Sequence, residues 1–308
     1  MGMGRWNSGA WDNYAASNVA GKSQAQVFTS RNMKPNYDPR EITVRESRDS
    51  ADNPKSTPII LASDVTGSMG MIAHNLMKDG LNTLAKEIYD RKPVTDPHIM
   101  VMAIGDAKSD SAPAQATQFE ADISLADQVR ELWIEGNGGG NGGESYSLAH
   151  YFAATKTVTD SWEKRRKKGY LFTIGDEPIH DGLTKGEIAK IFGHDPQSNL
   201  SAQDCVDMAM KTYEVFHIVL KNEGYASSRS GLPEVLKRWQ QILPQRVILL
   251  DDYTKLAEVV VSTIQVIEGA NKAAVAKSWS GSTAVTVANA IENLPANIQQ
   301  GGVVRLAS

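Results

Sequence analysis

PIILASDVTGSMG occupies residues 58–70 and joins an apolar run to a polar, glycine-containing turn. The apolar part, residues 58–64, has the length and composition of a strand buried on both faces of a sheet. Apolar residues then recur at helical spacing over residues 69–90, so a helix should follow the turn. A buried strand that leads directly into a helix is the basic unit of α/β proteins.

The same alternation of buried strands and helices continues along the chain. Further strands are predicted at 98–106, 118–122 (a short edge strand), 170–176, 214–221 and 246–252, and helices at 123–135, 145–158, 184–192, 201–212, 232–243 and 253–269. This alternation predicts an α/β fold with a doubly wound, mostly parallel six-stranded sheet and helices on both faces.

Composition divides the chain into three parts. Residues 1–54 are rich in Asn, Ser, Gly and charge, which predicts an extended N-terminal arm with little core of its own. Residues 55–269 carry the strand–helix pattern. Residues 270–308 are rich in Ala, Ser, Gly and Asn and are interpreted as a tail or accessory segment, with a potential final strand at 301–308.

Charge and composition narrow the function classes. The formal net charge of −4 argues against a general nucleic-acid-binding protein, which normally has a basic excess. The single cysteine, Cys205, excludes an internal disulfide and is interpreted as a packing residue. No stretch reaches the roughly 18 apolar residues of a membrane span. We therefore expect a soluble, cytoplasmic protein without a membrane partner, or virion association if a phage encodes it.

The turn after the first predicted strand carries the candidate chemistry. Ligands of open α/β sheets bind beyond the carboxyl ends of the strands. Asp64, Thr66 and Ser68 alternate there, so their oxygen-bearing side chains can point to one side. A carboxylate and two hydroxyls suit Mg²⁺, Mn²⁺ or Ca²⁺ better than zinc. Capping of the following helix is the alternative role for Asp64 and Thr66.

DVTGSM (64–69) resembles the D-x-[ST]-x-S signature of the metal-ion-dependent adhesion site of von Willebrand factor A domains. The resemblance covers about residues 57–268 and extends to uncharacterised intracellular members of that family from bacteria and phages. It implies a Rossmann-like fold with metal ligands on three loops at one end of the sheet. Asp64, Thr66 and Ser68 match the first loop, and Asp176, at the end of the strand 170–176, matches the Asp of the third.

The middle loop departs from the family's common pattern, in which a Thr follows a Gly-Gly pair. The chain has GGGNGGESYSLAHYF (138–152) there, which is more similar to the GGGD-x-PE variant of some members. In that alignment Asn141 takes the Asp position and Glu144 lies near the usual Thr. The resemblance therefore implies Glu144 as the ligand, with Ser145 or Asn141 as alternatives.

The function that the resemblance implies is a divalent-cation-dependent binding module, an adaptor or scaffold rather than an enzyme. One cation, Mg²⁺ in the first place and Mn²⁺ or Ca²⁺ as alternatives, would capture an Asp or Glu carboxylate of a protein partner. Bacterial relatives often work beside MoxR-type AAA+ ATPases, which makes such an ATPase a candidate partner.

Two other function classes are weighed against this one. The first is a structural or assembly protein, self-associating or phage-particle-associated, in which a metal would mainly hold the loops together. The second is a metal-dependent hydrolase, ranked last because no general base or nucleophile stands beside the motif.

Two further features are interpreted as structural. The basic run KRRKK (164–168) is expected to be a solvated helix end. His180 is expected to be a surface or turn residue.

Overall fold

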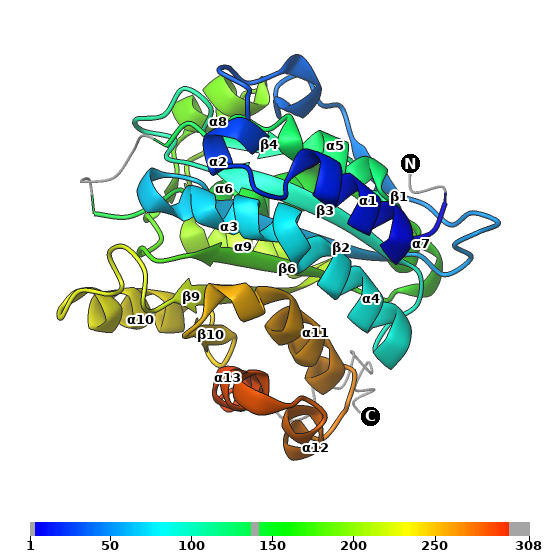
Figure 1. The fold of residues 1–308 in the computed structure, drawn as a ribbon. Coiled ribbons are helices and arrows are strands. Elements are labelled where there is room, and N and C mark those ends of the chain that lie inside the picture. The colour runs from blue at the N-terminus through cyan, green and yellow to red at the C-terminus, as the bar shows by residue number, and fades with distance from the viewer. Residues whose placement is uncertain (1–3, 137–141, 296–308) are drawn as a thin grey trace, which may run out of the picture.

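The centre of the computed structural model is a six-stranded sheet with the order β10-β9-β6-β2-β3-β4 (Figure 1). The structure describes residues 4–136 and 142–295. Five strands run parallel, and the short strand β4 runs antiparallel to β3. The strands are β2 (Thr57–Asp64), β3 (Pro97–Ile104), β4 (Ala114–Ala116), β6 (Gly169–Gly175), β9 (Tyr213–Leu220) and β10 (Val247–Leu250). The predicted mostly parallel, six-stranded α/β sheet is confirmed.

Side chains of the central strands alternate between two cores. Ile59 and Leu61 of β2 face one core, whereas Ile60 and Ala62 face the other. This period of two follows from strand geometry, and burial of both faces explains why the strand is a continuous apolar run. The first core packs against helices α3, α4, α5 and α11, and the second against α6, α8, α9 and α10.

The helices and minor strands complete the two outer layers (Figure 1). The helices are α1 (Ser8–Asn18), α2 (Gln24–Val27), η1 (Pro35–Tyr37), η2 (Gly67–Met69), α3 (Gly70–Asn75), η3 (Leu76–Gly80), α4 (Leu81–Arg91), α5 (Ser124–Arg130), α6 (Ser147–Thr155), α7 (Asp160–Arg165), α8 (Lys185–Phe192), α9 (Ala202–Ala209), α10 (Gly231–Ile242), η4 (Tyr253–Lys255), α11 (Leu256–Ile267), α12 (Lys272–Lys277) and α13 (Gly281–Ile291). Strand β1 (Arg45–Ser47) pairs with β5 (Thr157–Thr159), and β7 (Gly182–Leu183) pairs with β8 (Leu200–Ser201).

The order of the strands places a switch point beside β2. The chain passes from β2 to β3 and β4 on one side, then crosses to β6, β9 and β10 on the other. Crossovers that leave in opposite directions open a crevice at the carboxyl ends of the strands between them. The ends of β2 and β6 therefore mark the expected ligand position.

The N-terminal segment is not an extended arm over its described part. It forms α1 and α2, and Trp11 is only 1% exposed in the core that the sheet shares with α3 and α4. The ring of Trp6 stacks on Trp11 with centroids 5.2 Å apart, and its Nε1 donates to Asn82 of α4. Tyr14 also donates a hydrogen bond, to Asp127, and Val27 and Phe28 are buried in the same core. Scattered apolar residues thus dock a segment whose composition is mostly polar.

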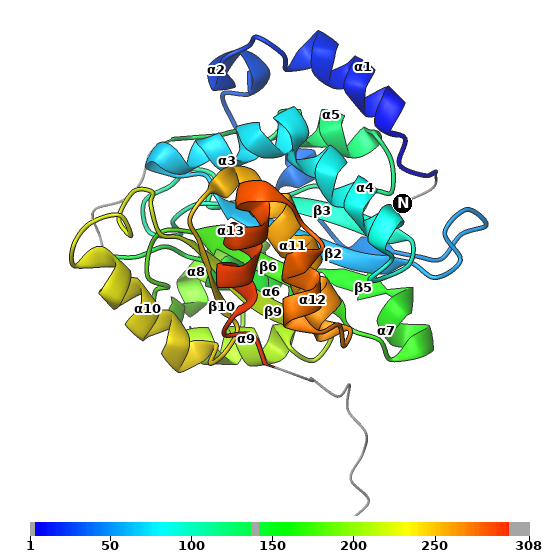
Figure 2. The same ribbon diagram turned by 60° about the horizontal axis from the view of Figure 1, so that its bottom comes forward.

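The C-terminal segment adds two helices to the face that α11 covers (Figure 2). Val275 of α12 and Val287 of α13 are buried in the same core as α11. The predicted final strand at 301–308 lies outside the described residues. In the part of the chain that the structure describes, no helix is long and apolar enough to cross a membrane.

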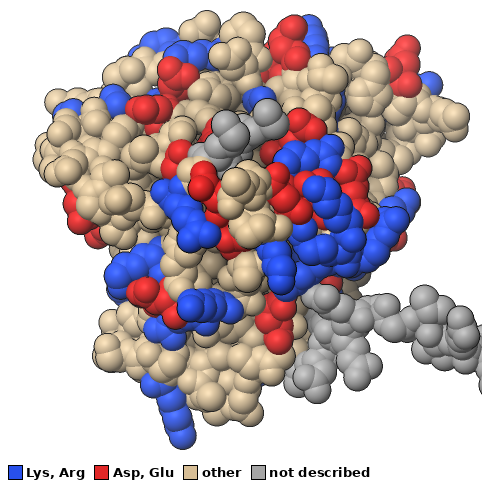
Figure 3. Space-filling model, turned by 90° about the vertical axis from the view of Figure 1, so that its right-hand side faces the viewer, with Lys and Arg blue, Asp and Glu red and all other residues tan. Residues whose placement is uncertain are grey.

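The edge strand and the basic run differ from the predictions in detail. The edge strand is Ala114–Ala116 rather than 118–122, where only Glu120 bridges to Ile99. Basic and acidic side chains intermingle on the side of the molecule that carries α7 (Figure 3). Lysines and arginines of the run 164–168 form ion pairs there with Asp160, Asp49, Glu268 and Glu214.

Candidate functional site

Three aspartates lie at the carboxyl ends of the three central strands. Asp64 ends β2, and Asp176 follows β6 immediately. The register pairs Ser63 with Ile174 and Asp64 with Ile104, so both aspartates and Asp106 emerge at one edge of the sheet. The parallel sheet therefore brings to one edge carboxylates that are far apart in the chain, as Asp64 and Asp176 are.

Thr66 joins two buried carboxylates. Its backbone N–H and its hydroxyl both lie 2.7 Å from Asp64 Oδ1, and the hydroxyl lies 3.1 Å from Glu144 Oε1. Asp64 is 1% exposed and Glu144 is fully buried. The hydroxyl can donate to only one of the two carboxyls, so the other contact is a hydrogen bond only when that carboxyl is protonated.

Glu144 is held by backbone pairing with the segment that follows β6. Its N–H donates to Pro178 O at 2.9 Å, and its carbonyl accepts from His180 N at 3.1 Å. These two bonds form a parallel bridge with Ile179. This pairing fixes the backbone of Glu144, whose carboxyl lies 3.1 Å from the Thr66 hydroxyl.

Electrostatics at this edge disfavours ionised carboxylates. Burial raises the pKa of Asp64, and the charges of Asp176 and Glu177 raise it further, while hydrogen bonds from Thr66 oppose the rise. Burial also raises the pKa of Glu144, together with repulsion from Asp64 and Glu177. The pKa values of Asp176 and Glu177 are raised as well, mainly by burial. The cluster is therefore stable only when a proton or a cation reduces its negative charge.

The hydroxyl of Tyr146 reaches Asp64 because the position beside it, Gly175, has no side chain. The hydroxyl donates to Asp64 Oδ2 at 3.3 Å. A Cβ on Gly175 would lie 1.9 Å from that hydroxyl oxygen, so only glycine lets the tyrosine reach Asp64.

Gly175→Ala is expected to destabilise the protein by about 1–3 kcal/mol, because overpacking forces Tyr146 away from Asp64. Urea unfolding would measure the change in the free energy of unfolding. Gly186→Ala in α8 is the matched control, since the nearest heavy atom to its added Cβ is 4.0 Å away. Equal stability of Gly175→Ala and wild type would show that the contact with Tyr146 does not constrain this position.

A second polar chain lies beside Glu144, and two of its members, Asp106 and Lys108, were not selected from the sequence. Ser145 Oγ donates to Asp106 Oδ1 at 2.9 Å, and His180 Nε2 lies 3.4 Å from the same oxygen. Lys108 Nζ lies 3.1 Å from His180 Nδ1. His180 is only 8% exposed, so the expectation of a surface histidine is wrong. The placement of Asp106 directly after a buried strand, the same signal that selected Asp64, would have identified it.

The predicted ligands are brought together only in part. Asp64, Thr66 and Glu144 are in contact, whereas Ser145 turns to Asp106. The carboxyl of Asp176 accepts a hydrogen bond from the backbone N–H of Tyr225. Asn141 and the side chain of Ser68 lie outside what the structure describes.

No family model matches the chain, and no curated protein matches it. Two solved structures of the pilus adhesin SpaC from Lactobacillus rhamnosus GG are similar, one of them in an open conformation. Their TM-scores are 0.46 and 0.45 at 10% identity, with 72% of this chain and 31% and 32% of the adhesin covered. The chain thus spans about a third of the length of these adhesins, and at such TM-scores the likeness says nothing of function.

The assignment to the von Willebrand factor A family is therefore wrong. No family model supports the assignment, and the two adhesin structures, with TM-scores below 0.5, do not support it either. The implied preformed adhesion site is not found either: within residues 4–136 and 142–295, no three His, Cys, Asp or Glu side chains are grouped to hold a metal ion. One physical reason is that Asp176 binds the amide of Tyr225. A MoxR-type ATPase, suggested by the family alone, loses its support as a partner.

Proposed function

We propose that the chain is a protein-binding module in which Asp64, Thr66 and Glu144 hold one divalent cation jointly with a carboxylate of the bound partner. The observation that carries this proposal is the pair of buried carboxylates around the Thr66 hydroxyl. Among the described residues, Glu144 Oε2 is buried without a hydrogen-bond partner. Such a site differs from a preformed metal centre, because the partner supplies one of the ligands.

The charge balance supports a cation rather than a basic side chain. In the described part of the chain, no Lys or Arg forms an ion pair with Asp64, Glu144 or Asp176, and the main electrostatic influences on Asp64 and Glu144 come from other carboxylates. Oxygen ligands of this kind suit Mg²⁺, with Mn²⁺ and Ca²⁺ as alternatives. A bound cation would stabilise the ionised form of both carboxyls.

The surroundings leave room for a partner. Gly67 and Gly142 flank Thr66 and Glu144 in the sequence and are both exposed. A Cβ at either glycine would meet no heavy atom within 4 Å. Asp64 and Glu144 are themselves buried, so an Asp or Glu side chain of another protein would reach the cation past these two glycines, where the incomplete ligand set favours a carboxylate.

Asp64→Asn is expected to weaken Mn²⁺ binding by at least the 10- to 100-fold that loss of an outer-shell group typically costs. Calorimetric titration of chelator-treated protein, alone and with an alternating Glu-Ser peptide, measures this directly. Glu120→Gln is the control, because Glu120 is another buried carboxyl with a raised pKa at the opposite end of β3. Absence of Mn²⁺ binding under both conditions, or equal binding by Asp64→Asn, would refute the proposal.

The structural or assembly function makes a different prediction for the same samples. Sedimentation of wild-type protein with Mg²⁺ and with chelator distinguishes the assembly function from the binding module. Oligomers that persist unchanged in chelator would favour assembly through surfaces away from Asp64. A monomer whose partner binding requires the cation would favour the binding module.

A further inference from the structure

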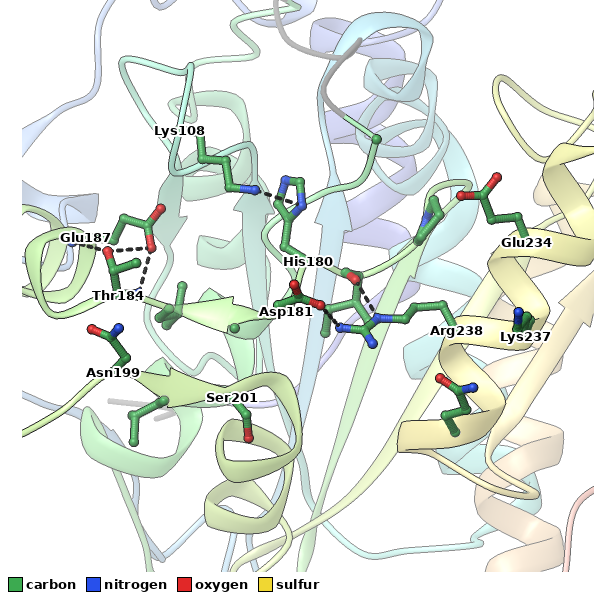
Figure 4. Close-up of a pocket in the computed structure, with 17 residues that line it drawn as sticks. Lys108, His180, Asp181, Thr184, Glu187, Asn199, Ser201, Glu234, Lys237 and Arg238 are labelled. Carbon is green, nitrogen blue, oxygen red and sulfur yellow. Dashed lines mark hydrogen bonds and ion pairs between the residues drawn. The ribbon is translucent and has the colours of Figure 1, made fainter.

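A cleft of about 790 Å³ opens next to the candidate site, between α10, the start of α8 and the antiparallel pair of strands β7 and β8 (Figure 4). The cleft and the site share one wall. Pro178 and His180 line the cleft, and the backbone of both pairs with Glu144. Gly142, two residues before Glu144, also lines the cleft, so the cleft lies beside the candidate site.

The acidic side chains of the cleft already have donors. Asp181 pairs with Arg238 Nη2 at 2.5 Å. Glu187 accepts from the backbone N–H and the hydroxyl of Thr184 in a helix capping box. Glu234 accepts from the hydroxyl of Tyr225 at 2.5 Å. These three carboxylates are consequently engaged within the protein.

Two lysines of the cleft have no such counterpart. In the described part of the chain, neither Lys108 nor Lys237 forms an ion pair with a carboxylate; Lys108 Nζ contacts His180 Nδ1 at 3.1 Å. Both lysines are exposed. Figure 4 shows Lys108 beside His180 on one side and Lys237 with Arg238 on α10 on the other. The cleft thus offers two ammonium groups to an incoming ligand.

We propose that this cleft binds an acidic peptide segment of the partner, with further Asp or Glu side chains placed against Lys108 and Lys237. The inference rests on the proposed function, since the first carboxylate of the same segment would lie on the cation. The volume falls in the range of roughly 300–1,000 Å³ that is usual for ligand sites. The partner is then recognised by several carboxylates of one segment.

A peptide fits this cleft better than a nucleic acid does. Three acidic residues line the cleft beside its three basic residues Lys108, Lys237 and Arg238. A nucleic acid carries a charge on every phosphate and would be repelled by Asp181, Glu187 and Glu234. A peptide can alternate acidic and neutral side chains, so that its carboxylates contact the lysines and its neutral side chains lie near the acidic residues of the cleft.

The test uses the full-length protein with Mn²⁺ and a fluorescein-labelled Glu-Ser repeat of about ten residues, which spans about 33 Å when extended. Anisotropy should show binding that is roughly tenfold weaker for the double variant Lys108→Gln/Lys237→Gln, as expected when two charge pairs are lost. The control is Lys55→Gln/Lys277→Gln, which changes the net charge equally at exposed positions outside the cleft. A Gln-Ser repeat of equal length tests the need for carboxylates.

The outcomes separate the two proposals. Equal peptide affinity of wild type and Lys108→Gln/Lys237→Gln, or equal binding of the Gln-Ser repeat, would overturn the acidic-segment inference even if Mn²⁺ binds. Loss of peptide affinity in the lysine variant with unchanged Mn²⁺ titration supports it. If Mn²⁺ does not bind while the lysine effect persists, the cation proposal fails and the cleft remains an acidic-peptide site.

Discussion

Raising the pH from about 6 to about 7 is expected to tighten divalent-cation binding at Asp64 and Glu144 by roughly tenfold to a hundredfold. The pKa of Asp64 is raised to about 8 and that of Glu144 to about 9 in the cation-free protein, through burial and repulsion from neighbouring carboxylates. Both carboxyls are therefore protonated near pH 6. For each proton that the cation displaces, the affinity for the cation rises about tenfold per pH unit.

The stability of the cation-free protein should change with pH in the opposite sense. An Asp in the unfolded chain has a pKa of about 3.9, whereas Asp64 in the folded protein titrates near 8. Between these values the folded state binds more protons than the unfolded state, so stability falls as the pH rises. Saturating cation should offset this loss, because the folded state then binds the cation in place of the protons.

Thermal unfolding with Mg²⁺ and with chelator at several pH values between about 5.5 and about 8.5 measures both effects together, because the cation-induced rise in Tm reports affinity. The rise should grow with pH in wild type and in Glu120→Gln. It should be nearly flat in the double variant Asp64→Asn/Glu144→Gln, which has no proton to displace. A rise in Tm that is independent of pH in wild type would contradict the assignment of these two carboxyls as ligands.

The strands could be predicted because both faces of the sheet are covered. Residues that alternate between two cores must all be apolar, so each central strand is a short apolar run such as 58–64 or 214–221. The edge strand β4 lacks this constraint. Its pairing with β3 spans only Ala114–Ala116, and the apparent strand at 118–122 contributes a single bridge at Glu120.

Strand order alone could predict only the site residues at strand ends, whereas the expectation for Glu144 comes from a resemblance of the segment 138–152 to a family motif. Asp64 and Thr66 lie in the turn after β2, and a carboxyl end at a switch point identifies them. The role of Glu144 depends on its bridge with Ile179, a contact between two loops. Likewise, His180 is buried because Asp106 lies opposite it, a pairing that spacing in the sequence does not reveal.

The family assignment failed because the short motif DVTGSM can also arise from the needs of a local turn. Asp64 Oδ1 accepts from the backbone N–H of Thr66 two residues later, a turn that Asp favours in many proteins. The pattern D-x-T therefore indicates a carboxylate that stabilises a turn at the end of a strand. They predict where the carboxylate lies, but they do not identify the domain around it.

Trp11→Ala is expected to lower the free energy of unfolding by about 3–5 kcal/mol, the usual cost of removing a buried tryptophan. The side chain is 1% exposed, stacks on Trp6 and lies in the main core with residues of α3 and α4. Urea unfolding measures the loss. Limited proteolysis should in addition cleave the variant faster near Gly21, because α1 is held chiefly by these aromatic contacts.

Trp11→Phe is the matched control for this experiment. Among the described residues, the indole Nε1 of Trp11 has no hydrogen-bond partner, so phenylalanine keeps most of the apolar contact and removes a buried polar group. Its cost should be well below that of Trp11→Ala. If Trp11→Ala changes neither the urea midpoint nor the cleavage rate, α1 is not part of the cooperative core, and the residues before β1 behave as the separate arm that their composition suggests.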